Sequence, residues 1–142
     1  APYSKNIIKL LEEILLFDNA NLFDFVHFSV NSICSYLDIK VPIIESSSIQ
    51  IDHSLKCQEK VLSICQAMKA QVYINPIGGI HLYSKQMFEN HGIELLFFKI
   101  NSFEYPQFNG GEFVPHLSII DLLMNCSLDE TKQILYQKYN LL

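Results

Sequence analysis

The stretch of sequence that decides the fold is VYINPIGGIHLYSKQMFENHGIELLFFKIN, residues 72–101. Residues 72–74 are β-branched or aromatic, as in a strand, and Pro76 ends that strand because proline has no N–H to donate to a ladder. Ser84 is placed to cap a helix over residues 85–90, and Gly92 follows where a helix end takes a left-handed residue. Residues 93–100 are nearly all apolar, which is typical of a strand buried on both faces of a parallel sheet. The stretch therefore predicts a strand–helix–strand crossover.

Two amphipathic helices are expected before this unit. The first covers residues 4–17, and the second runs from a cap at Asn19 or Asn21 to about Leu37. Their connection is short, so we expect antiparallel neighbours. The inner face of the second helix is expected at these apolar positions: Leu22, Val26, Val30, Ile33 and Leu37.

The remaining elements complete the fold class. We expect a short strand over residues 40–45, a helix that Ser54 caps and that ends near Lys69, and a short helix over residues 118–125. Ser127 and Glu130 form a capping box that opens the last helix. Three strands joined by helical crossovers should be parallel. The sequence thus predicts a single α/β domain over residues 1–142, with a small, mostly parallel sheet of about three strands covered by helices.

Composition excludes several classes of function. The net charge is −5 and all ten cations are lysines, so the chain lacks the arginine fork that favours phosphate and guanine contacts, and nucleic-acid binding is disfavoured. No apolar run is long enough to span a bilayer and no signal peptide is visible, so no membrane insertion is expected. The four cysteines include no CxxC pair, which favours free thiols, a cytoplasmic location and no metal site.

A candidate binding site follows from the predicted sheet. Ligands of open parallel sheets bind beyond the carboxyl ends of the strands, which here are residues 45–48, 75–79 and 101–107. The substrate-binding candidates in or beside these stretches are Ser46, Ser47, Asn75, Gly78, Gly79, Tyr83, Tyr105 and Gln107. The competing interpretation is that such loops contain Ser, Asn, Gly and Pro simply because turns need them.

The glycine pair and the histidine beyond it have two interpretations each. Gly78 and Gly79 could let a ligand approach the backbone, or could serve a tight turn. The stretch matches neither phosphate-loop pattern. His81 could be a packing residue or a catalytic base.

A second group of candidates lies on the short helix after Pro115. Ser118, Asp121 and Asn125 share one polar stripe on an otherwise apolar helix. Asp121 would then lie near the interior and need partners. We name Asp121 and Ser118 as the catalytic candidates, while a structural Asp121 that fixes the aromatic loop is the favoured alternative.

These residues also carry a family resemblance. The motifs YINPIGG (residues 73–79), YPQF (residues 105–108) and FVPHLSIIDLLMN (residues 113–125) resemble the WbqC-like protein family. Members are longer, so the chain is similar to their C-terminal portion, and we expect it to be a fragment of a larger α/β domain. The resemblance implies a role in bacterial surface-polysaccharide (O-antigen) biosynthesis.

Two functions are compatible with that resemblance. The first is a cytoplasmic transferase that acts on a small-molecule substrate such as a nucleotide sugar, with its cofactor unknown. The second is a non-catalytic binding or assembly module of the same pathway, with the aromatic loop over residues 103–113 as its contact surface. A homodimer is expected if a sheet edge is left unpaired.

Overall fold

The computed structural model describes residues 1–107 and 110–142, and this part of the chain divides into two compact units. Unit 1 comprises residues 1–43 and 102–138, and unit 2 comprises residues 44–101 and 139–142. The expectation of a single α/β domain stays a prediction. The α/β class itself is confirmed by six helices and a three-stranded sheet in the described residues.

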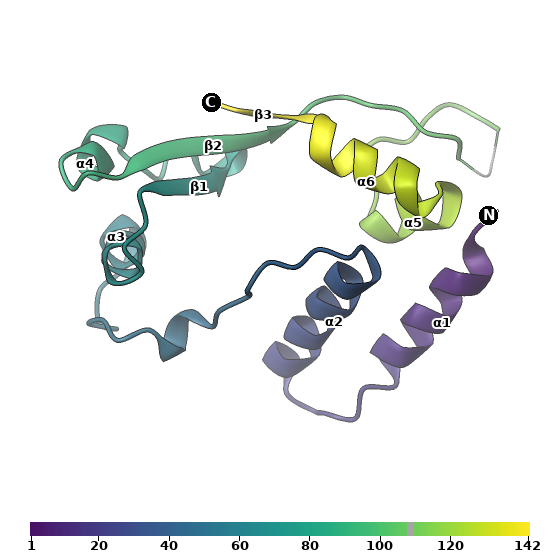
Figure 1. Ribbon diagram of the computed structural model, residues 1–142, viewed down its shortest axis with the longest axis horizontal. Coiled ribbons are helices and arrows are strands. Elements are labelled where there is room, and N and C mark those ends of the chain that lie inside the picture. The colour runs from purple at the N-terminus through teal and green to yellow at the C-terminus, as the bar shows by residue number, and fades with distance from the viewer. Residues whose placement is uncertain (108–109) are drawn as a thin grey trace. The chain divides into compact units, whose positions relative to one another are not determined.

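Unit 1 is helical in its described residues. Its helices are α1 (Ser4–Leu15), α2 (Leu22–Tyr36), α5 (Ile119–Asn125) and α6 (Leu128–Gln137). Asn21 caps α2 by accepting from the Phe23 N–H over 2.8 Å, which selects Asn21 from the two predicted caps. Figure 1 shows α1 and α2 side by side and running in opposite directions, as their short connection predicts.

The core of unit 1 joins helices that are far apart in the sequence. Ile7 of α1, Leu37 after α2 and Leu123 of α5 are buried together. Half-buried apolar side chains surround them: Leu11, Ile33, Tyr36, Ile39, Ile119, Ile120 and Met124. The Tyr3 N–H also donates to the Met124 backbone oxygen over 3.0 Å, so α5 is held against the start of α1.

Unit 2 contains the crossover that the sequence predicts. Its elements are a 3₁₀ turn (Ser46–Ser48), α3 (Cys57–Ala67), β1 (Val72–Pro76), a second 3₁₀ turn (Ile77–Gly79), α4 (Lys85–Glu89), β2 (Glu94–Ile100) and β3 (Tyr139–Leu141). β1 pairs with β2 in parallel, and α4 lies in the connection between them. Ser84 caps α4, and Gly92 has a φ of 72°, so both local predictions are confirmed.

The sheet of unit 2 is covered on one face. Leu95 and Phe97 of β2 are 2% and 1% exposed, and they pack with Leu62 of α3 and Phe88 of α4. The opposite face keeps half-exposed or exposed apolar side chains: Val72, Ile74, Leu96, Phe98, Ile100, Tyr139 and Leu141. The prediction that β2 is buried on both faces is therefore wrong.

The third strand is not the predicted one. Residues 40–45 form no strand, and the third position in the sheet is taken by β3, which runs antiparallel to β2. Pro42 has no N–H for a ladder, and a tripeptide at the far end of the sequence pairs instead. The sheet is mixed rather than all parallel.

Two helix predictions also need correction. Leu22, Val26 and Val30, predicted to face inward, are 75%, 49% and 43% exposed, and α2 buries no residue fully. Ser54 does not cap α3: it bonds Asp52 instead, and α3 starts at Cys57. Periodicity identifies a helix, but the face that is buried depends on which partner packs there.

Candidate functional site

Unit 1 holds a polar cluster along α5, built from Asp121 and Asn125 of the helix and from Tyr105 of the loop before it. The Tyr105 hydroxyl donates to Asp121 Oδ2 over 2.7 Å. Asn125 Nδ2 donates to the Asp121 backbone oxygen over 2.8 Å and to Oδ1 over 3.3 Å. The four-residue spacing brings these two side chains to the same side of the helix. Each carboxylate oxygen of Asp121 therefore has one donor, and an ionised carboxylate keeps further acceptor sites for a substrate.

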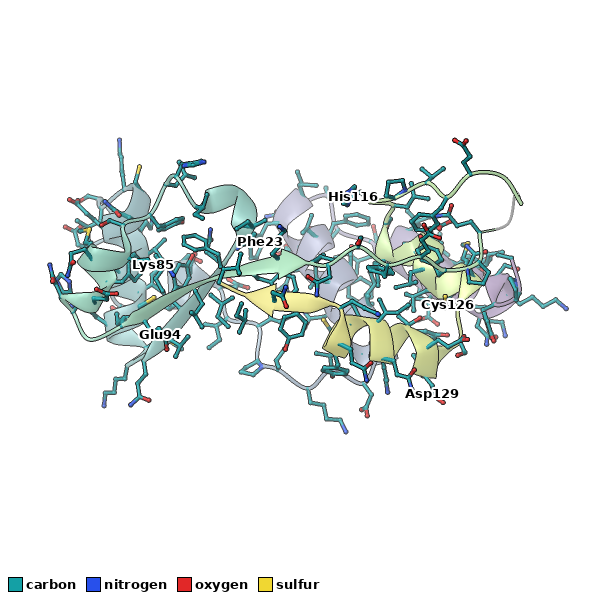
Figure 2. The ribbon with its side chains drawn as sticks, turned by 90° about the horizontal axis from the view of Figure 1, so that it is seen from above. Phe23, Lys85, Glu94, His116, Cys126 and Asp129 are labelled. Carbon is teal, nitrogen blue, oxygen red and sulfur yellow. The ribbon has the colours of Figure 1, made fainter. Side chains whose placement is uncertain are left out.

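Burial shapes the protonation of the groups around this cluster. Burial, followed by the hydrogen bond to Asp121, raises the pKa of the Tyr105 hydroxyl. Burial, followed by the carboxylates of Glu130 and Asp121, raises the pKa of the Cys126 thiol. Figure 2 labels Cys126, which directly follows α5. Both groups thus stay protonated at neutral pH, so Tyr105 acts as a donor and Cys126 is a poor nucleophile.

The loop before α5 is fixed by its own side chains. Gln107 Nε2 donates to the Val114 backbone oxygen over 2.8 Å, and the Val114 N–H donates to Gln107 Oε1 over 2.9 Å. The Tyr105 ring meets Phe113 edge-on at 5.3 Å between centroids, and Phe103 lies 6.0 Å from Tyr105. Residues 108 and 109 of this predicted aromatic loop lie outside the described residues.

Unit 2 holds the second group of candidates, centred on Asn75. The Tyr73 hydroxyl donates to Asn75 Oδ1 over 3.1 Å, and Asn75 Nδ2 donates to the Pro76 backbone oxygen over 3.0 Å. A Cβ at Gly79 would collide with the Asn75 carboxamide. A side chain at position 79 would therefore displace the Asn75 carboxamide, whereas a Cβ at Gly78 would meet nothing within 4 Å.

Aromatic rings hold this second group in place. Tyr73 stacks on the fully buried Phe88 with 5.5 Å between centroids, and Tyr83 packs against both rings. Burial, followed by the hydroxyl of Tyr83, raises the pKa of Tyr73 above its ordinary range. This arrangement is a packed aromatic cluster with two hydrogen bonds at the Asn75 side chain.

Both groups of candidate residues lie in a part of the chain that matches a known protein family. The sequence profile of the WbqC-like protein family matches residues 1–133, which include both groups of candidates. The chain belongs to the WbqC-like protein family. No solved structure matches it.

One curated relative of this WbqC-like chain matches at a significant level. It is "Uncharacterized protein Rv1507c" of Mycobacterium tuberculosis, 27% identical over 108 residues. The match covers 75% of the present chain and 46% of the relative, so the chain spans about half the length of the curated relative that it matches. The relative's name assigns no reaction.

The predicted site residues of the WbqC-like chain fall into the two units. Tyr105, Gln107, Ser118 and Asp121 lie in unit 1. Unit 2 holds Ser46, Ser47, Asn75, Gly78, Gly79 and Tyr83. Ser46 and Ser47 follow no strand, so the prediction that three strand ends supply the site is wrong for that stretch. No hydrogen bond joins these two serines to Asn75 or Tyr83 in the described part of the chain.

Sequence reasoning missed two features of these groups. The sequence predicts only a strand at Tyr73, whereas the structure shows that its hydroxyl also donates to the Asn75 side chain. Gln107 is predicted to bind a ligand, which stays a prediction, and the structure adds that its side chain bridges the two arms of the loop. The period-two pattern could have placed Tyr73 and Asn75 on one face of β1. Nothing in the pattern places Gln107 beside Val114.

A separate hollow of about 210 Å³ lies at the end of α2, lined by Asn31, Cys34, Ser35, Asp38, Ile39, Lys40 and Val41. It contains none of the predicted site residues. The Asp38 and Lys40 side chains on its rim pair at 3.0 Å and are largely exposed. A salt bridge between two exposed side chains contributes little to the stability of the fold. The two charges balance each other, so the pair does not indicate a charged ligand.

Within residues 1–107 and 110–142, no group of three or more His, Cys, Asp or Glu side chains could hold a metal ion. None of the helices in these ranges has the length and hydropathy that crossing a bilayer requires.

Proposed function

We propose that this WbqC-like chain belongs to a transferase of bacterial surface-polysaccharide biosynthesis, which acts on an activated sugar or a related donor in the cytoplasm. The observation that carries the proposal is the Tyr105–Asp121–Asn125 cluster, which lies within the residues matched by the family. A carboxylate that two side chains hold in one orientation is what a transferase needs to accept a proton from an incoming hydroxyl or amine.

The cluster supplies distinct roles. Asp121 is the base, or orients the attacking group, through acceptor sites that Tyr105 and Asn125 leave unused. Tyr105 remains a donor because its pKa is raised. Ser118 accepts from the Ile120 N–H over 3.2 Å as the cap of α5, and its hydroxyl proton can still be donated to a substrate oxygen.

The test is a thermal-shift titration of the full chain with a panel of nucleotide sugars and acyl donors. At about ten times Kd, a bound donor should raise Tm by about 3 °C. Asp121→Asn should abolish that rise while Tm without ligand changes little, since an amide fills the same volume. Asp129→Asn is the matched control, because Asp129 is exposed on α6 in the same unit (Figure 2), and it should keep the rise.

The contrary outcomes are specific. If no donor raises Tm, the transferase proposal loses its support. If Asp121→Asn lowers the free energy of unfolding by about 1.5–3 kcal/mol and the donor-induced rise persists, Asp121 is a structural residue that fixes the aromatic loop.

The second candidate is a non-catalytic binding or assembly module of the same pathway. The observation that favours it is the apolar second face of the unit 2 sheet, where Val72, Ile74 and Ile100 are 44%, 48% and 60% exposed. Exposed apolar faces of this kind are typical of interaction domains. Under this function Asp121→Asn destabilises the fold and no small donor binds.

A further inference from the structure

The strand β1 forms an edge of the unit 2 sheet. The strand order is β1-β2-β3, so β1 pairs with β2 on one side and meets no strand on its other side in the described part of the chain (Figure 1). The Glu94 N–H of β2 donates to the Gln71 oxygen over 2.8 Å, which fixes the phase of the parallel ladder. Alternate residues of such a strand turn both backbone groups toward the same neighbour, and the residues of β1 that turn toward β2 are Tyr73 and Asn75.

The residues between them leave their backbone groups unpaired at this edge. Val72 and Ile74 turn their N–H groups and oxygens away from β2, and no hydrogen bond in the part of the chain that the structure describes involves these groups. Pro76 has no N–H, and its oxygen accepts from the Asn75 side chain over 3.0 Å and keeps a second lone pair. An open edge of this kind is a template for another β-strand.

The sequence does not protect this edge with charge. Natural edge strands are commonly blocked by lysine or other charged side chains, by proline or by a bulge. Residues 70–84 contain no Asp, Glu, Lys or Arg, and the proline of β1 is its last residue, Pro76. Val72 and Ile74 are 44% and 48% exposed on the uncovered face of the sheet, so their side chains are available for contact as well.

We propose that β1 pairs with β1 of a second copy of this chain, antiparallel and about a two-fold axis between the two Ile74 residues. This register gives the homodimer that the sequence predicts a specific interface. Each Ile74 N–H donates to the Ile74 oxygen of the other copy, and each Val72 N–H donates to the Pro76 oxygen. Every outward N–H of the strand thus finds an acceptor in an identical strand. The opposed side chains are all apolar, Ile74 beside Ile74 and Val72 beside Pro76, so no charge resists the pairing.

The first arm of the test uses the unchanged chain. Because interfaces smaller than about 1,200 Å² are weak, its average mass in sedimentation equilibrium should rise from that of a monomer at about 5 µM toward that of a dimer at about 1 mM. Over the same range, amide hydrogen exchange should slow at Val72 and Ile74 and change little at Tyr73 and Asn75, which already pair with β2. A monomer at every concentration, or a dimer without slower exchange at Val72 and Ile74, overturns the proposal.

The second arm tests the register at the axis. Ile74→Lys and Ile74→Glu should each raise the dimer Kd about tenfold, since like charges then face each other, and an equimolar mixture of the two should regain the dimer. Ile100→Lys and Ile100→Glu are the matched controls, because Ile100 is 60% exposed on the same face but belongs to β2, and each should dimerise as the unchanged chain does. Circular dichroism checks that all four variants fold. A mixture that dimerises no better than its components, or a loss of the dimer in the Ile100 variants, overturns the proposal.

Discussion

Asn75 shows how a single side chain can stabilise a loop whose sequence resembles a ligand-binding site. Its carboxamide accepts from Tyr73 and donates to the Pro76 backbone oxygen, so the side chain bridges the end of β1. Gly79 lies against that carboxamide and is buried. The glycine allows a close approach, and in this structure the group that approaches it is the Asn75 side chain.

Gly79→Ala should therefore destabilise the chain by about 1–2 kcal/mol, because the new methyl group displaces Asn75 from its hydrogen bonds. Gly78→Ala is the matched control: a Cβ there meets nothing within 4 Å, and its free energy of unfolding should change by less than about 0.5 kcal/mol. Urea unfolding followed by circular dichroism measures both. Equal stabilities of the two variants would contradict the role assigned to Gly79.

At the scale of a secondary-structure element, the capping residues show which local sequence signals are enough to predict where a helix begins. Ser127 accepts from the Glu130 N–H over 3.2 Å, and Glu130 Oε2 accepts in return from the Ser127 N–H over 2.8 Å. Both halves of this box lie within four residues, so the sequence is enough to predict it. Ser54 is also a serine, and it lies three positions before α3. Its hydroxyl does not cap that helix, because it donates to Asp52 Oδ1 over 2.7 Å within a local turn.

Ser127→Ala should lower the free energy of unfolding by about 1 kcal/mol, since the first turn of α6 loses its cap. Ser54→Ala is the control, because it removes only an exposed hydrogen bond within a turn, and it should cost less than half as much. Thermal melts of the two variants compare these losses of stability. A larger loss for Ser54→Ala would mean that the turn at Asp52 supports α3 more than the capping box supports α6.

Each of the two units holds a tyrosine whose proton is retained in the folded state. Burial raises the pKa of Tyr73 in unit 2 and of Tyr105 in unit 1 above the ordinary value of 10.0. A folded pKa above the unfolded one favours the protonated native state. The resulting stability is complete below about pH 10 and is lost as pH rises through the folded pKa.

The free energy of unfolding should therefore fall as pH rises above about 10. Tyr73 contributes up to about 1.4 kcal/mol per pH unit, and Tyr105 contributes less because solvent screens it more. Tyr73→Phe and Tyr105→Phe should each flatten this decline in urea unfolding between pH 9 and pH 11. Tyr136→Phe, 62% exposed on α6, should leave it unchanged. A decline that is the same in all three variants would contradict these directions.

Signals that act within a few residues were enough to predict most elements of this chain. The caps at Ser84 and Ser127 and the left-handed Gly92 each depend on neighbours close in sequence, where steric and hydrogen-bonding preferences are strong. The parallel pairing of β1 with β2 joins residues farther apart, and it follows from the strand–helix–strand order of residues 72–100. The hydrogen bond between Tyr105 and Asp121 spans sixteen residues, and the polar stripe of α5 predicted only one side of it.

Contacts between segments far apart in the sequence determine the features that local patterns do not predict. β3 closes the sheet in place of residues 40–45, since a ladder needs a free edge and available N–H groups, and local propensity specifies neither. The exposed apolar stripe of α2 and the uncovered face of β2 have the same physical cause. An apolar pattern shows which side chains can be buried, but packing against other segments determines which of them are buried.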